Sequence, residues 1–205
     1  FGIEVRALQL LHPLPATIGG QQGLILRTEE TGEQDFEVLL PADAVPAAWN
    51  QLMTSGAPFG IKPVGAQARE LLRIEAGLPK AGPDLNEEIV PPEANLEGKA
   101  FSLSKGCYPG QEVVARMDTY GNVRRHLVGL IIQDKTVPPA GSKLFSGERE
   151  VGWVSSAVFS PQRNAALAFG FPLRDFSAPD TTLTVEVAGT RHQATVHALP
   201  FQKHS

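Results

Sequence analysis

The feature that most constrains the fold of this chain is a series of short apolar runs between residue 124 and the C-terminus. The runs occupy residues 127–132, 143–145, 151–154, 165–171, 182–187 and 192–198. Turn signals such as Ser146-Gly147, Ser160-Pro161 and Gly189-Thr190 lie between them. Short strands at this spacing are typical of a small barrel or sandwich. We therefore predict that residues 124–205 form an all-β domain.

The first 98 residues mix strand and helix patterns. Residues 3–11 alternate like a strand, and apolar runs at 23–26 and 36–40 flank a polar turn, which favours an antiparallel pair. Asp43 is expected to cap a helix whose apolar positions begin at Val45. This part is therefore predicted to be an α+β domain spanning residues 1–98.

A second helix is predicted over residues 64–76, and its last turn carries a carboxylate. One apolar stripe of this helix comprises Val64, Ala68, Leu71 and Leu72. Glu75 continues the stripe, and Gly77 is predicted to end the helix as its C′ residue. A carboxylate on an inward face is costly unless it is hydrogen-bonded or paired. Glu75 is thus expected to bind a ligand, to pair with Arg69 or Arg73, or to lie exposed at a frayed helix end.

The single cysteine of the chain, Cys107, lies in a predicted connector over residues 99–123 that follows a long loop at 83–96. Pro109 is predicted to open a helix, since its fixed φ suits the first helical position, which makes Tyr108 the N-cap. A thiol just before such a terminus and two residues from Lys105 should ionise more readily than a free one. Cys107 is therefore either a reactive thiolate or, as isolated cysteines commonly are, a buried hydrophobe.

Composition and charge exclude several classes of function. At 42% hydrophobic and 20% charged residues, the sequence is that of an ordinary globular protein. A net charge of −4 with interspersed signs gives no basic footprint, so we expect no direct binding of nucleic acid. No apolar run reaches membrane-spanning length, and the five histidines lack the spacing of metal ligands. A single cysteine cannot form an internal disulfide, which fits the cytoplasm.

Two segments resemble a known family. Residues 105–112, Lys-Gly-Cys-Tyr-Pro-Gly-Gln-Glu, resemble the signature of the YgfZ family of folate-binding proteins, which serve iron–sulfur cluster assembly and repair. The resemblance continues through Val113-Val114-Ala115-Arg116, Gly121 and Arg124-Arg125-x-Leu127. Residues 72–79, Leu-Arg-Ile-Glu-Ala-Gly-Leu-Pro, resemble the pterin-contacting helix end of the aminomethyltransferase (glycine cleavage T-protein) superfamily. The implied fold is α+β: an aminomethyltransferase-like folate-binding domain, with an antiparallel sheet and helices, followed by a small antiparallel β-barrel.

The resemblance also implies a ligand, partners and site residues. Tetrahydrofolate is the expected cofactor, with Glu75 accepting hydrogen bonds from the donor edge of the pterin. Cys107 and Lys105 are the expected catalytic pair, and the partners would be iron–sulfur proteins or their assembly factors, with an indirect effect on tRNA modification. The further residues expected to bind the cofactor are Arg73, Tyr108, Gln111, Glu112, Arg124 and Arg125. Arg124 and Arg125 either hold the glutamate tail of the folate or face solvent.

Two other functions stay open. One is a folate-dependent aminomethyl- or methyltransferase, in which folate accepts a one-carbon unit, although such enzymes lack the Cys-Tyr-x-Gly-Gln-Glu motif. The other is a non-catalytic interaction module that uses the motif as a docking turn. The family carries a further N-terminal segment with an acidic residue of the folate pocket. Because the sequence opens on Phe1 without that segment or an initiator Met, we expect it to be a fragment.

Overall fold

The computed structural model describes residues 4–98, 100–102, 104, 106–112, 114–115 and 123–202. Its contacts divide the chain into two compact units, Phe1–Leu72 and Arg73–Lys203. The division falls before the predicted boundary at residue 98, because the segment after Leu72 packs on strands of the second unit. The domain boundaries at residues 98 and 123 stay a prediction.

The first unit contains an antiparallel sheet of three strands in the order β1-β2-β3. The strands are β1 (Leu14–Ile18), β2 (Gln21–Thr28) and β3 (Asp35–Leu39). The predicted antiparallel pair is confirmed, with Leu24 of β2 opposite Leu39 of β3. Asp35 closes the turn between them, because its carboxylate accepts hydrogen bonds from the backbone N–H groups of Glu30 and Thr31 at 2.9 and 2.8 Å.

Two predictions for the first unit are wrong. The strand expected at residues 3–11 contains instead the short 3₁₀ helix η1 (Val5–Ala7), and residue 3 lies outside the described residues. Helix α1 (Val45–Gly56) begins where the pattern predicts, but its N-cap is Ala44 and no side chain caps it. Asp43 does not cap α1 because it lies in the preceding turn, where the Ala44 N–H donates to the Pro41 carbonyl. A 3₁₀ helix, η2 (Ala57–Phe59), follows α1.

Helix α2 (Ala66–Glu75) buries its C-terminal end rather than one side along its length. Its buried residues are Arg73, Ile74 and Glu75. The predicted apolar stripe is therefore wrong: Val64 lies before the helix and is 67% exposed, whereas Ile74 is fully buried. Ile74 belongs to an apolar cluster with Leu127, Leu167, Phe169, Phe171 and Phe201. This cluster fixes the end of α2 in the second unit.

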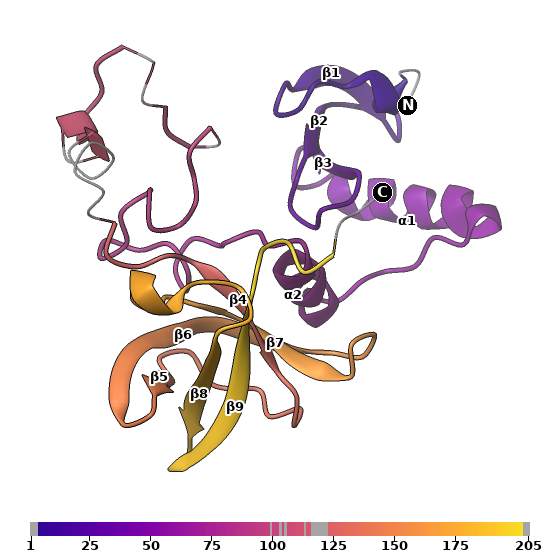
Figure 1. Ribbon diagram of the computed structural model, residues 1–205. Helices are drawn as coiled ribbons and strands as arrows, with labels where there is room; N and C mark the ends of the chain where they lie inside the picture. Colours follow the sequence, from indigo (N-terminus) through magenta and orange to yellow (C-terminus); the bar gives the residue numbers. More distant parts are fainter. Residues whose placement is uncertain are drawn as a thin grey trace. The chain divides into compact units, whose positions relative to one another are not determined.

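The second unit is built on a closed antiparallel barrel of strands in the order β4-β7-β6-β5-β8-β9, drawn in orange to yellow in Figure 1. The strands are β4 (Val128–Ile132), β5 (Lys143–Ser146), β6 (Arg149–Ser160), β7 (Ala165–Gly170), β8 (Thr182–Val187) and β9 (Thr190–His197). Pairing of β9 with β4 closes the barrel, which leaves no open sheet edge. The predicted barrel is thus confirmed. A 3₁₀ helix, η3 (Arg174–Phe176), follows β7.

Gly77 ends α2, as predicted, in a Schellman motif. Its N–H donates to the Ile74 carbonyl and the Leu78 N–H to the Arg73 carbonyl, both at 3.0 Å. Its φ of +72° lies in the left-handed region that only glycine adopts without cost. A Cβ at this position would also lie 3.1 Å from Leu199 Cβ and 3.1 Å from Pro200 Cα.

Gly77→Ala is therefore expected to lower the free energy of unfolding. The loss should exceed the ~1–2 kcal/mol that an alanine loses by adopting the left-handed conformation alone. Urea unfolding followed by circular dichroism measures the loss. Gly141→Ala is the matched control, since Gly141 has a φ of +84° but open space around its missing Cβ. Equal losses for the two variants would mean that the close approach to Leu199 and Pro200 has no energetic effect.

Candidate functional site

Glu75 is a buried carboxylate at the C-terminal end of α2. The residue is 6% exposed, and its Oε1 accepts a hydrogen bond of 2.7 Å from the hydroxyl of Ser160, the last residue of β6. Its backbone carbonyl accepts a hydrogen bond from the Phe201 N–H at 3.0 Å. Hydrogen bonds from two other residues of the second unit, Ser160 and Phe201, therefore hold both the side chain and the main chain of Glu75.

The alternatives that gave Glu75 an arginine partner or an exposed position are wrong. Arg69 forms its ion pair with Glu30, and Arg73 forms its ion pair with Asp84. Among the described residues, the second oxygen of Glu75, Oε2, accepts no hydrogen bond. A carboxylate has about four lone-pair positions, and Ser160 uses one of them. The Glu75 carboxylate thus keeps capacity to accept hydrogen bonds from a ligand.

Arg73, expected to contact the cofactor, lies in a buried network centred on Asp84. Its Nη1 lies 2.8 Å from Asp84 Oδ2 and also donates to the Leu78 carbonyl at 2.8 Å. Asp84 is fully buried, and its Oδ1 accepts hydrogen bonds of 2.6 Å from the hydroxyls of both Ser155 and Ser156. These contacts bind the segment after α2 to β6. A role of Arg73 as a folate ligand stays a prediction.

An irregularity in β6 explains how two consecutive serines bond to one carboxylate. Successive side chains in a regular strand point to opposite faces of the sheet. The register between β6 and β7 shifts between Val154 and Ser156, which is the signature of a β-bulge. A bulge inserts an extra residue and redirects its side chain. The bulge therefore lets the Ser155 and Ser156 hydroxyls reach the same oxygen of Asp84.

Arg124 and Arg125 lie on the barrel unit just before β4. Arg124 is exposed, while the Arg125 guanidinium lies 4.9 Å above the ring of Trp153 in β6. Trp153 in turn stacks on Phe171, with ring centroids 5.6 Å apart. The Arg125 Nε is buried and has no hydrogen-bond partner in the described part of the chain. The geometry gives Arg125 a fixed, stacked guanidinium, and it leaves Arg124 facing solvent.

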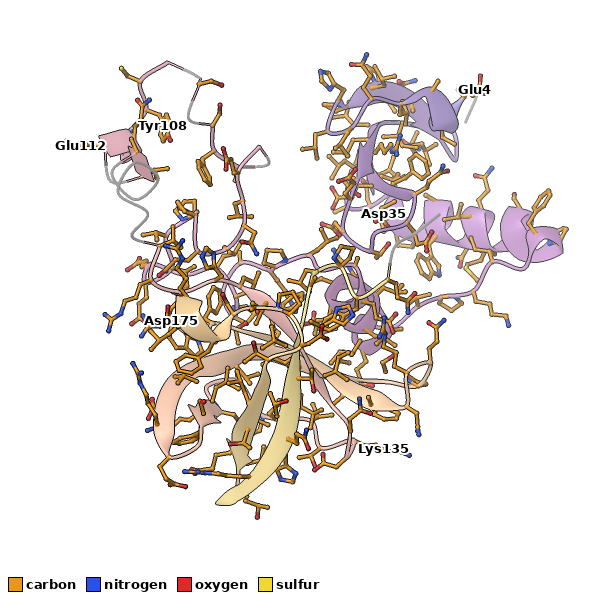
Figure 2. The ribbon with its side chains drawn as sticks, viewed as in Figure 1. Glu4, Asp35, Tyr108, Glu112, Lys135 and Asp175 are labelled. Carbon is orange, nitrogen blue, oxygen red and sulfur yellow. The ribbon has the colours of Figure 1, made fainter. Side chains whose placement is uncertain are left out.

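Charged residues of both signs lie close to His126, the residue after Arg125. Partial burial and the neighbouring Arg174 lower the pKa of His126, and the nearby Glu93 raises it by a smaller effect. The Arg174 N–H donates to the Arg124 carbonyl at 3.0 Å, which ties η3 to the segment before β4. Asp175, labelled in Figure 2, is an acidic residue of η3.

The connector differs from its predicted geometry. Cys107 is exposed and free, so the buried alternative is wrong. The predicted helix start at Pro109 is also wrong, because Gly110 has a φ of +85° and the first helical residue is Gln111. Cys107 thus lies four residues before the helix, beyond the reach of its first turn. Lys105 lies outside the described residues.

Three further residues of the predicted site, Tyr108, Gln111 and Glu112, lie in the described part of the connector, and no hydrogen bond of the described residues joins them to Glu75. Tyr108 and Gln111 are half-buried and Glu112 is exposed. Tyr108 and Glu112 are labelled in Figure 2. Glu75, Arg73 and Arg125 all belong to the second unit, the first two at the end of α2 and the third just before β4. Their assembly into one site with Cys107, Tyr108, Gln111 and Glu112 stays a prediction.

A cavity of about 560 Å³ lies in the first unit, and its lining includes none of these residues. Its lining is largely apolar and includes Ile18, Phe36, Val45, Trp49 and Leu52. Within the described residues, no group of three or more histidine, cysteine or carboxylate side chains could hold a metal ion. None of the helices in the described part of the chain is long and apolar enough to cross a membrane.

Sequence reasoning missed the buried partners of Glu75 and Arg73. Asp84 lies in the segment interpreted as a loop, and Ser160 served only as a turn signal. One signal was available: Ser155-Ser156 interrupts an otherwise apolar strand, and adjacent polar residues in a buried strand require partners. The identity of those partners was not accessible, because they lie 71 and 72 residues away in the sequence.

Comparison with known proteins finds two family models that together match most of the chain. The family model of the GCVT N-terminal domain matches residues 2–103, and that of the glycine cleavage T-protein C-terminal barrel domain matches residues 125–203. An aminomethyltransferase of Chlorobium limicola is 34% identical over 183 residues, which are 89% of this chain and 50% of that protein. One of a Geobacillus species is 35% identical over 187 residues, 91% of this chain and 51% of that protein.

A solved structure gives the same result. The glycine cleavage system aminomethyltransferase T from Bartonella henselae superposes with a TM-score of 0.82 at 26% identity. The match covers 98% of this chain and 55% of that structure, so the chain spans about half the length of the relatives that it matches. These comparisons support the superfamily and not the narrower YgfZ branch. The chain therefore belongs to the aminomethyltransferase superfamily, with a match to the GCVT N-terminal domain followed by the glycine cleavage T-protein C-terminal barrel domain.

Proposed function

We propose that this protein binds tetrahydrofolate through Glu75 and that the bound folate accepts a one-carbon unit, as in an aminomethyltransferase. The observation that carries the proposal is the Glu75 carboxylate, which is 6% exposed and held on one oxygen by Ser160. A carboxylate in this state can accept two parallel hydrogen bonds from the amino group and ring N–H of a pterin. The three similar proteins reported above are each named as an aminomethyltransferase, which supports folate as the ligand.

We assign a partner to the remaining part of the folate from its negative charge. The p-aminobenzoyl-glutamate part of folate ends in carboxylates, which a stacked guanidinium binds well. Arg125, with its buried Nε and its place over Trp153, is the proposed partner of this tail. Arg124 is exposed and would add charge without a fixed geometry.

Maintenance of iron–sulfur proteins is a second candidate function. It is favoured by the exposed thiol of Cys107 within the Lys-Gly-Cys-Tyr-x-Gly-Gln-Glu segment. The chain has one cysteine, so it can donate at most one thiolate ligand to a cluster that a partner also holds. In this proposal, iron–sulfur proteins or their assembly factors are the partners, and Cys107 with Lys105 is the reactive pair.

One assay separates the two functions. Under the aminomethyltransferase proposal, transfer of a one-carbon unit to tetrahydrofolate is expected to continue unchanged in Cys107→Ala, because Cys107 is not joined to Glu75. The assay follows methylene-tetrahydrofolate formation by wild-type protein and by this variant. Detectable folate binding with no transfer, together with loss of iron–sulfur enzyme activity in cells that carry Cys107→Ala, would favour the second function instead.

A further inference from the structure

We infer that Ser160 is a positioning residue for the proposed folate site, because its hydroxyl fixes the plane of the Glu75 carboxylate. This inference rests on the proposed function and concerns a residue that does not itself contact the ligand. Ser160 is fully buried and its Oγ lies 2.7 Å from Glu75 Oε1. The two residues are 85 positions apart in the sequence, so the contact depends on the fold of the barrel.

The Ser160 hydroxyl also has a second contact. It donates to Glu75 Oε1, and the Arg163 backbone N–H donates to its oxygen at 3.3 Å. A serine hydroxyl has one proton to donate and two lone pairs that accept, so the two contacts are compatible. Together they hold the hydroxyl in one orientation, with its proton toward the Glu75 carboxylate.

The position of Ser160 makes this donor rigid. Ser160 is the last residue of β6 and pairs with Ala165 at the start of β7, so its backbone lies within the barrel ladder. Arg163 lies in the turn between these strands, and the Asn164 N–H donates to the Pro161 carbonyl at 3.3 Å. The hydroxyl is thus oriented by a closed turn.

Orientation matters because the last torsion of a glutamate is soft. Rotation about this sp³–sp² bond is broad, so an unrestrained carboxylate samples many planes. A pterin presents its amino group and ring N–H side by side in one plane, and a bidentate contact requires the carboxylate to lie in that plane. A hydrogen bond from Ser160 to one oxygen selects the plane before the ligand arrives, which lowers the entropic cost of binding.

The neighbouring serines of β6 provide a matched control. Ser155 donates to Asp84 and not to Glu75, and it is likewise buried in the same strand. Loss of its hydroxyl removes a hydrogen bond of similar length, 2.6 Å against 2.7 Å. Ser155→Ala is therefore expected to lower stability without acting through Glu75.

A double-mutant cycle on tetrahydrofolate binding tests the inference. Kd is measured by calorimetry for wild type, Ser160→Ala, Glu75→Ala and the double variant, since alanine at position 75 removes the acceptor of the Ser160 hydroxyl. Ser160→Ala is expected to raise Kd about 10-fold in the wild-type background and at most about twofold when Glu75 is already alanine. Ser160→Thr, which keeps the hydroxyl, is expected to restore binding. Ser155→Ala is expected to give the same small change in both backgrounds.

The outcomes separate this inference from the proposed function. If wild-type protein binds tetrahydrofolate but Ser160→Ala has equal effects in the two backgrounds, Ser160 does not act through Glu75 and the inference is overturned. If wild-type protein does not bind tetrahydrofolate at all, the proposed function fails and this role of Ser160 fails with it. Should Ser160→Ala not fold, Ser160→Cys is measured in the same cycle, since a thiol of similar size is a much weaker donor.

Discussion

Replacing Asp84 with alanine is expected to lower the free energy of unfolding by about 3–5 kcal/mol, the usual result of removing one partner of a buried ion pair. Asp84 is fully buried and Arg73 is 7% exposed, so the variant removes the carboxylate that pairs with a buried guanidinium at 2.8 Å. It also leaves the hydroxyls of Ser155 and Ser156 without their acceptor. Urea unfolding, followed by the fluorescence of Trp153 in the adjacent strand, measures the loss.

Two control variants separate the loss of the buried charge from the loss of a hydrogen-bond acceptor and from the loss of any paired carboxylate. Asp84→Asn keeps an acceptor for the serines but removes the charge, and it should cost less than Asp84→Ala. Asp134→Ala removes an exposed carboxylate that pairs with His192 on the same unit, and exposed pairs contribute only about 0–1 kcal/mol. If Asp84→Ala cost no more than Asp134→Ala, the buried network would not hold the segment after α2 to the barrel.

Glu75→Gln is expected to weaken tetrahydrofolate binding by about 1.5–3 kcal/mol, which is roughly a 10- to 150-fold increase in Kd. The substitution keeps the shape of the side chain but removes the charge that strengthens both hydrogen bonds to the pterin. Because Ser160 can still donate to the amide oxygen, the end of α2 is expected to stay folded. Calorimetric titration measures Kd, and circular dichroism checks the fold.

Glu93→Gln is the matched control for this prediction. Glu93 is a second buried glutamate of the same unit, 9% exposed, and its Oε2 accepts from the Val90 N–H at 3.5 Å. Glu93 lies near His126, beside the proposed site of the folate carboxylates, so its neutralisation should not weaken binding. An unchanged Kd for Glu75→Gln as well would remove Glu75 from the folate site.

Local patterns were sufficient to predict an all-β second unit and the end of α2, whereas the choice of a barrel over a sandwich came from the family resemblance. Short apolar runs and turn residues are local properties, and they correctly gave the strands of the second unit. Gly77 was also correctly placed, since a glycine after a helical pattern satisfies the left-handed C′ position. The inward position of Glu75 was one of the alternatives predicted, but from an apolar stripe that is wrong: Glu75 is buried because the C-terminal end of α2 is buried.

The partners of these residues could not be predicted, because they are set by tertiary contacts. The hydroxyl of Ser160 and the β-bulge that directs Ser155 and Ser156 depend on the closure of the barrel. The connector failed for a different reason. Pro109 suits the first position of a helix, but Gly110 adopts a left-handed backbone with a φ of +85°. The helix therefore begins at Gln111. Local preference alone did not distinguish these two conformations.

The motif in the connector resembles one branch of the superfamily, whereas the whole-chain comparisons support only the superfamily. The octapeptide around Cys107 points to the YgfZ branch, whereas the matches along the whole chain give the aminomethyltransferase superfamily. Both assignments imply folate, and both use the segment that carries Glu75. The folate site is therefore the central claim, and the role of Cys107 is separate from it.

The most direct test of that claim is a calorimetric comparison of tetrahydrofolate with an analogue that lacks the 2-amino group of the pterin. Wild-type protein is expected to bind tetrahydrofolate at least about 10-fold more tightly, because the analogue loses one charge-assisted hydrogen bond to Glu75. Glu75→Gln is expected to lose most of this preference. Absence of binding, or equal affinity of wild-type protein for the two compounds, would contradict the assignment of Glu75 as the residue that recognises the pterin.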